Sequence, residues 1–223
     1  MPGSLQAVFW DMDGTLVDTE PHWIREETAL VESFGARWTD SHAEDCVGQA
    51  LPYTAARMQE AGVQMSVREI IDHLITRVAA SAREQMPWRP GAREALSVLQ
   101  QAGVRSALVT MSEPTLAGAV VEALPPGQLE FMVTGDAVSR GKPDPEAYLS
   151  AFETMARTHP EPLDPRRCLA FEDSVPGVTA AVDAGLVTVA VPHWMPIPES
   201  DRYQQIPGLQ GLDLAAMQRL LPA

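Results

Sequence analysis

Five short apolar runs constrain the fold of this 223-residue chain more than any other feature of its sequence. Most residues of each run are apolar and each run ends within a few residues, as a strand does when both faces of its sheet are covered. Helical patterns alternate with the runs from Pro90 onward. This alternation predicts an α/β fold, here a Rossmann-like, doubly wound parallel sheet with helices on both faces. The runs cover residues 6–10, 104–110, 131–134, 168–171 and 186–191, and the helical patterns cover residues 92–102, 114–124, 145–155, 175–184 and 212–221.

The stretch from residue 19 to residue 86 breaks this alternation. It contains helical patterns at 24–34, 53–61 and 67–82 and no convincing strand. The chain length suits one compact domain with a sizeable insertion better than two equal domains. We therefore predict an α/β core made of residues 1–18 and 87–223, with an all-helical insertion at 19–86. The alternative is that these helices simply cover an edge of the sheet.

The charge balance restricts the partners of the chain. Thirty acidic residues stand against sixteen Lys and Arg, which gives a formal net charge of -14. This charge repels polyanions, so we expect no binding to nucleic acid or to an acidic membrane surface. No apolar stretch reaches the roughly 18 residues that a membrane span needs. The only cysteines, Cys46 and Cys168, are too few for a disulfide scaffold or a thiolate metal site. We expect a cytoplasmic monomer.

The sharpest motif, Asp-Met-Asp-Gly-Thr at 11–15, directly follows the first apolar run. Ligands of open α/β sheets bind beyond the carboxyl ends of the strands, which is where this motif must lie. Asp11 and Asp13 are two residues apart, so both can point into one pocket. Two carboxylates so close repel each other unless a cation or hydrogen bonds separate their roles. The alternative is a plain turn at Asp13 and Gly14, with Asp11 capping a helix.

The motif resembles the opening motif of the haloacid dehalogenase superfamily, specifically of its phosphatase branch. The resemblance implies that Asp11 is the nucleophile and Asp13 the general acid/base. The chemistry is consistent with these roles, because a carboxylate can attack phosphorus and so divide one difficult displacement into two easier ones. The second acid can protonate the departing alkoxide and later activate water.

Two further segments resemble the second and third motifs of that family. Thr110 ends the second apolar run, and Lys142 lies in the run Gly-Lys-Pro-Asp-Pro. Taken alone, a Thr at a strand end is more often a turn cap, and a lone Lys is more often a surface charge. The resemblance implies that both are catalytic, Thr110 through its hydroxyl and Lys142 through its positive charge. It also implies that Met12, Asp13, Thr110, Met111 and Lys142 bind the phosphoryl group.

An acidic pair, Glu172 and Asp173, ends the fourth apolar run and resembles the fourth family motif. The resemblance implies a Mg²⁺ site made by this pair, Asp11 and the backbone carbonyl of Asp13. Oxygen ligands completed by water and phosphate are what Mg²⁺ prefers. Asp173 is the favoured ligand, and Glu172 binds directly or through water. The alternative is that Asp173 and Ser174 only cap the following helix.

The resemblance covers nearly the whole chain, and the insertion at 19–86 resembles the family's cap domain. It implies a Mg²⁺-dependent phosphatase that hydrolyses a small phosphorylated metabolite, such as a sugar phosphate. One alternative is a phosphomutase of the β-phosphoglucomutase type, in which a His commonly stands where this chain has Trp23. An indole cannot accept a proton, so Trp23 favours hydrolysis, although a shift of one residue would place His22 there. A non-catalytic binding protein on this fold is the other alternative.

Overall fold

The computed structural model describes residues 4–47 and 49–222 of the chain. The chain divides into two compact units. The first, called the α/β unit, combines Met1–Asp18 with Pro87–Ala223, and the second, called the helical unit, is Thr19–Met86. No helix in the described part of the chain is long and apolar enough to cross a membrane.

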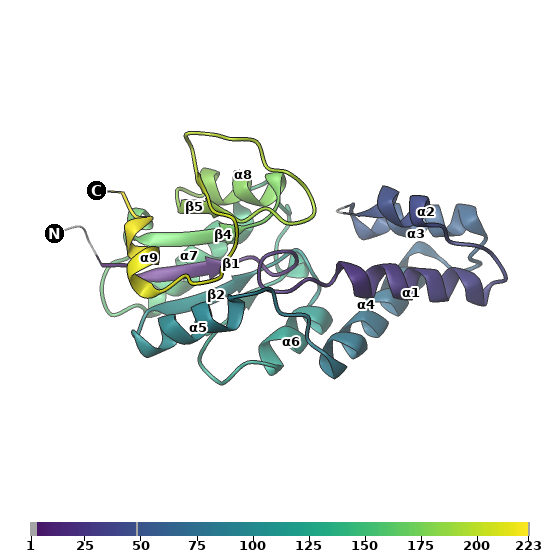
Figure 1. Cartoon of the computed structure of the whole chain (residues 1–223), viewed down its shortest axis with the longest axis horizontal. Coiled ribbons are helices and arrows are strands. Elements are labelled where there is room, and N and C mark those ends of the chain that lie inside the picture. The colour runs from purple at the N-terminus through teal and green to yellow at the C-terminus, as the bar shows by residue number, and fades with distance from the viewer. Residues whose placement is uncertain (1–3, 48, 223) are drawn as a thin grey trace. The chain divides into compact units, whose positions relative to one another are not determined.

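The α/β unit is built on a sheet of six strands in the order β3-β2-β1-β4-β5-β6, and every pair of neighbours is parallel. Figure 1 shows β1, β2, β4 and β5 side by side. The predicted α/β class with a parallel sheet is therefore confirmed. The strands are β1 (Ala7–Trp10), β2 (Arg105–Val109), β3 (Met132–Val133), β4 (Cys168–Glu172), β5 (Val187–Ala190) and β6 (Gln204–Gln205).

Helices connect these strands and cover the sheet. Ala7 and Phe9 of β1 belong to a core that includes Tyr148 and Ala151 of α7 and Ala181 of α8, so these helices cover one face. α5 packs on β2 and on α9. The helices of this unit are α5 (Ala92–Gln101), α6 (Pro114–Glu122), α7 (Glu146–Thr158), α8 (Val175–Asp183) and α9 (Leu214–Arg219), with 3-10 turns at Gly135–Ala137 and Pro165–Arg167.

The central strands end at the same edge of the sheet. Trp10 at the end of β1 is in register with Leu108 of β2 and with Phe171 of β4. Its ring stacks on that of Phe171 at a centroid distance of 4.4 Å. Because parallel strands run in one direction, the residues that follow β1, β2 and β4 emerge together at this edge.

The helical unit has its own apolar core, and no strand occurs in its described residues. Leu30 and Val31 of α1, Met58 of α3, and Ile70 and Leu74 of α4 are among the buried residues of that core. The predicted helices at 24–34, 53–61 and 67–82 correspond to α1, α3 and α4. The short polar α2 has no counterpart among them. The bounds are α1 (Glu20–Ser33), α2 (Asp40–Cys46), α3 (Leu51–Ala61) and α4 (Val67–Glu84).

Glu27 of α1 is a buried acidic side chain of the helical unit. Glu27 accepts a hydrogen bond from Trp38 Nε1, with 3.3 Å between Nε1 and Oε2. Burial raises the pKa of Glu27 from 4.5 to about 7; the Trp38 bond opposes this rise, and the negative charge of Glu20 adds to it. The folded state thus holds the proton more tightly than the unfolded chain, so the free energy of unfolding falls as the pH rises from about 4.5 to about 7.

We expect Glu27→Gln to stabilise the protein in mildly alkaline solution. Glutamine keeps the shape of the protonated acid and can still accept from Trp38, but it has no charge to bury. The free energy of unfolding should rise by up to about 3 kcal/mol near pH 8 and change little below about pH 4.5. Urea unfolding at both pH values tests this, with Glu32→Gln, an exposed position on the same helix, as the control. An equal effect of Glu27→Gln at both pH values would contradict the assignment.

Candidate active site

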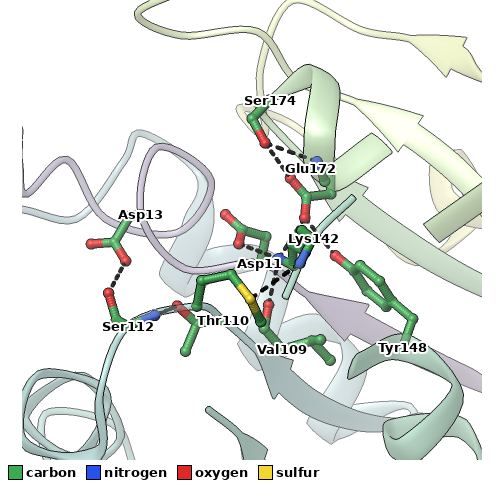
Figure 2. A network of polar contacts seen from close by, with 11 residues as sticks. Asp11, Asp13, Val109, Thr110, Ser112, Lys142, Tyr148, Glu172 and Ser174 are labelled. Carbon is green, nitrogen blue, oxygen red and sulfur yellow. Dashed lines mark hydrogen bonds and ion pairs between the residues drawn. The ribbon is translucent and has the colours of Figure 1, made fainter. Parts of the chain in front are cut away.

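Lys142 lies at the centre of a buried polar cluster at the carboxyl ends of the strands (Figure 2). Its Nζ donates to Asp11 Oδ1 at 2.7 Å, to Glu172 Oε1 at 2.6 Å and to the carbonyl oxygen of Val109 at 2.8 Å. Burial alone would lower the pKa of Lys142, but Asp11 and Glu172 outweigh it and raise this pKa above its ordinary value. Lys142 is therefore a permanent cation bonded to Asp11, not a surface charge.

The segment that carries Lys142 packs on the end of β2. The backbone nitrogen of Lys142 donates to Met111 Sδ at 3.3 Å. A Cβ at Gly141 would lie 2.9 Å from the same sulfur, so only glycine fits there without a shift of Met111. Met111, which the sequence placed in the phosphate site, therefore also supports the lysine.

Glu172 is fully buried, and its carboxylate is occupied by protein groups. Oε1 accepts from Lys142 and, at 2.8 Å, from the hydroxyl of Tyr148, while Oε2 accepts from Ser174 Oγ at 3.3 Å. Burial and repulsion from Asp11 nevertheless raise the pKa of Glu172 to about 7. These contacts leave Glu172 less available to a metal than its half-buried neighbour, Asp173.

Asp173 follows Glu172 at the end of β4, and its pKa is raised to about 9 by burial and by repulsion from Asp11 and Glu172. The N-cap of α8 is Ser174, whose side chain accepts from the backbone nitrogen of Gly177 at 3.1 Å. The carboxylate of Asp173 is therefore not needed to cap α8. It can take part in the acidic cluster with Asp11 and Glu172.

Two glycines make room for these acids. Gly14 has a φ of +82°, and a Cβ there would overlap the carboxylate of Asp173. A Cβ at Gly177 would overlap the carboxylate of Glu172. The glycines of the first and fourth motifs are thus required by the close approach of backbone to carboxylate.

The acidic side chains fit a divalent cation. Asp11, Glu172 and Asp173 each offer one oxygen, and these oxygens lie within 4.8 Å of one another. Asp11 Oδ2 is buried and has no hydrogen-bond partner among the residues that the structure describes. Three carboxylates face one lysine, and their mutual repulsion adds to the effect of burial in raising the pKa values of Glu172 and Asp173. A hard cation held by these oxygens would relieve that repulsion.

Asp13 lies apart from the Lys142 cluster, as Figure 2 shows, and its carboxylate does not belong to the metal-binding group of described residues. Ser112 Oγ donates to Asp13 Oδ2 at 2.6 Å. The backbone nitrogen of Ser112 in turn donates to the hydroxyl oxygen of the buried Thr110 at 3.0 Å. The two aspartates therefore have different surroundings, as different chemical roles require.

The turn that contains Asp13 is hydrogen-bonded to residues 87–89, the segment that follows the helical unit in the chain. The backbone nitrogen of Asp18 donates to the carbonyl of Pro87, and that of Arg89 to the carbonyl of Leu16, both at 2.8 Å. The guanidinium of Arg89 donates to the carbonyl oxygen of Gly14. These bonds fix the backbone directly after Asp13.

Three polar residues of this site were not anticipated from the sequence: Ser112, Tyr148 and Arg89. Tyr148 offered one signal, because it lies on the apolar face of α7 and a buried tyrosine hydroxyl usually finds a partner. Ser112 follows Thr110 by two residues, a spacing that by itself indicates only a turn. Arg89 lies in a Pro-rich segment with no local pattern that would predict its partner.

Comparison with known proteins identifies the family of the chain. The family model of the haloacid dehalogenase-like hydrolases matches residues 5–185. A phosphorylated carbohydrates phosphatase of Thermotoga maritima is 32% identical over 190 residues, covering 82% of each chain. Hexitol phosphatase B of Escherichia coli K12 is 27% identical over 197 residues, covering 86% of this chain and 85% of its own.

A solved structure supports the same placement at the level of the fold. CbbY of Rhodobacter sphaeroides, in complex with phosphate, aligns with a TM-score of 0.79 over 95% of this chain and 98% of its own, at 23% identity. The resemblance first noted in the motifs around Asp11, Lys142 and Glu172 is confirmed. The chain is an enzyme of the haloacid dehalogenase-like hydrolase family.

Proposed function

We propose that this enzyme is a Mg²⁺-dependent phosphatase that hydrolyses a small sugar phosphate through an aspartyl-phosphate intermediate. The observation that carries the proposal is the state of Asp11, whose Oδ1 is bonded to Lys142 while Oδ2 has no hydrogen-bond partner in the described part of the chain. A buried carboxylate with one oxygen fixed and the other unbonded suits a nucleophile. The activities named for the two phosphatase relatives support the substrate class.

In the first step, a carboxylate oxygen of Asp11 attacks phosphorus, and the bond from phosphorus to the sugar oxygen breaks. Asp13 gives its proton to the departing alkoxide. In the second step, Asp13 takes a proton from water as the water oxygen attacks phosphorus, and the bond to Asp11 breaks to release phosphate. Bound Mg²⁺, held by Asp11, Asp173 and the carbonyl of Asp13, with Glu172 bound directly or through water, would neutralise phosphoryl charge.

The remaining residues position these two acids. Lys142 fixes Asp11 and brings positive charge to the phosphoryl site. Ser112 holds the carboxylate of Asp13, and Thr110 holds the backbone of Ser112 in turn. The backbone at Met12 and Met111 contributes to the phosphate site. The helical unit acts as the cap that selects the substrate.

Hydrolysis is favoured over phosphomutase activity by the residues at the start of α1. Trp23 is half-buried and packs on the apolar core of the helical unit, and its indole cannot accept a proton. His22 contacts Arg25 Nη2 through Nδ1 at 3.0 Å. Water is therefore the expected acceptor of the phosphoryl group.

A screen of phosphorylated metabolites, with free phosphate as the readout, tests the function. We expect sugar or sugar-alcohol monophosphates to be the best substrates. Phosphorus NMR of β-glucose 1-phosphate with a trace of the 1,6-bisphosphate distinguishes the two reactions. Accumulation of glucose 6-phosphate without free phosphate would show that the enzyme is a mutase and not a phosphatase. No turnover of any ester would indicate a binding protein.

We expect Ser112→Ala to reduce kcat by about tenfold or more, with a smaller effect on KM, since it removes the hydrogen bond that orients the acid/base rather than a contact that binds substrate. Steady-state kinetics with the best substrate measures both constants. Ser112→Thr restores a hydroxyl and should recover most of kcat. An unchanged kcat in Ser112→Ala would show that Asp13 needs no such support.

A further inference from the structure

Tyr148 of α7 joins the apolar core of the α/β unit to the acidic cluster. Its side chain is fully buried, and its ring packs in the same core as Ala7 and Phe9 of β1. Its hydroxyl donates to Glu172 Oε1, with 2.8 Å between the two oxygens. Because the packed core holds the ring, the hydroxyl keeps a fixed direction toward that oxygen.

Both lone pairs of Glu172 Oε1 are used by hydrogen bonds. A carboxylate oxygen has two lone pairs with which it can accept. One lone pair of Oε1 accepts from Tyr148, and the other accepts from Lys142 Nζ at 2.6 Å (Figure 2). A cation that used Oε1 as a ligand would therefore have to displace one of these two hydrogen bonds.

The other oxygen of Glu172 faces the start of α8. Oε2 accepts from Ser174 Oγ at 3.3 Å, and a Cβ at Gly177 would lie 1.9 Å from it. The backbone of α8 thus lies directly against this side of the carboxylate. It leaves the carboxylate little room to rotate, so Oε1 remains the oxygen that faces Lys142.

Mg²⁺ and Ca²⁺ differ in how much they gain from a further carboxylate oxygen. Mg²⁺ needs a near-ideal octahedron and usually takes about one or two carboxylates, with water and phosphate in the remaining positions. Ca²⁺ takes about six to eight oxygens in a flexible arrangement, including both oxygens of one carboxylate. Asp11 and Asp173 already offer the carboxylates that Mg²⁺ needs. A freed oxygen of Glu172 would therefore favour Ca²⁺ more than Mg²⁺.

We propose that the Tyr148 hydroxyl determines the metal selectivity of the site, because it keeps Glu172 Oε1 hydrogen-bonded and so favours Mg²⁺ over Ca²⁺. Tyr148 acts through Glu172, so it is a positioning residue and not a ligand. This inference rests on the metal site of the proposed function and adds the residue that selects the ion.

Tyr148→Phe removes the hydroxyl and keeps the ring, including its contact with Lys142, whose Nζ lies 5.1 Å from the ring centroid. The rise in Tm with the concentration of MgCl₂ or CaCl₂, measured without substrate, gives the Kd of each cation. We expect the ratio of the Kd for Ca²⁺ to the Kd for Mg²⁺ to fall about fivefold or more. A merely structural role would weaken the binding of both cations and leave this ratio unchanged.

Tyr203→Phe is the matched control, because it also removes a tyrosine hydroxyl of the α/β unit, one that donates to the carbonyl of Pro198. It should keep the wild-type ratio. A double variant identifies the carboxylate through which Tyr148 acts. In Glu172→Gln, which has no charged oxygen to free, adding Tyr148→Phe should leave the ratio nearly unchanged. A full fall of about fivefold in that background would overturn the proposal.

The wild-type protein supplies a measurement that does not depend on whether a variant folds. Equal Kd values for Ca²⁺ and Mg²⁺ in the wild type overturn the proposal, and so does an unchanged ratio in a Tyr148→Phe protein that circular dichroism shows to be folded. Failure of the proposed metal site gives a different result. Neither salt would then raise the Tm of the wild type, and the inference would fail with that site.

Discussion

Replacing Asp11 with Asn is expected to reduce kcat by about four orders of magnitude or more. Asparagine keeps the size of the side chain and can still accept from Lys142, but its amide cannot form the acyl-phosphate. The group that makes the covalent intermediate cannot be replaced by an amide of the same shape, because the amide oxygen is a poor nucleophile. Release of phosphate from the best sugar phosphate measures the loss.

Two controls separate lost chemistry from lost structure. Circular dichroism and thermal unfolding should show a folded Asp11→Asn protein, and Asp201→Asn, an exposed loop position, should keep wild-type activity. Trapping with beryllium fluoride places a phosphoryl mimic on the nucleophile. An adduct on another side chain, or an Asp11→Asn variant with more than about a tenth of wild-type kcat, would contradict the role of Asp11.

The architecture of the α/β unit follows from features that act locally in the sequence. The apolar runs that form β1, β2, β4 and β5 are covered on both faces, so their composition alone identifies buried strands. β6 (Gln204–Gln205) is polar and exposed, and it exists because the returning tail pairs with β5, where Ile206 donates to the carbonyl of Ala190. A strand defined only by its distant partner has no local pattern to predict it.

The site residues also divide into those that a local sequence pattern predicts and those that it does not. The acids and Lys142 could be singled out because each lies in a short motif, and Asp11 and Asp173 directly follow β1 and β4. The partners that orient them could not, because Ser112 is 99 residues from Asp13 and Tyr148 is 24 residues from Glu172. Glu172 is the most instructive case. Its sequence position left open whether it would bind a metal directly or through water. Its oxygens accept hydrogen bonds from Lys142, Tyr148 and Ser174, and no local pattern predicts the contact with Tyr148.

Removal of divalent metal is expected to abolish activity. EDTA should bring phosphate release to background, Mg²⁺ should restore it, and Ca²⁺ should restore it poorly, because its larger and looser shell misplaces the nucleophile. The physical reason is the crowding of Asp11, Glu172 and Asp173 around one lysine. Full activity in a preparation shown to be free of metal would contradict this mechanism.

The same crowding predicts how Mg²⁺ binding depends on pH. Burial and repulsion hold protons on Asp173, with a pKa of about 9, and on Glu172, with a pKa of about 7. A cation must displace those protons, so the Mg²⁺ concentration that gives half-maximal activity should fall as the pH rises from about 6 to about 9. Mg²⁺ should also raise the Tm of the wild-type protein, because it binds only the folded state. Asp173→Asn should lose most of that rise in Tm, whereas a full rise would show that the cation binds elsewhere.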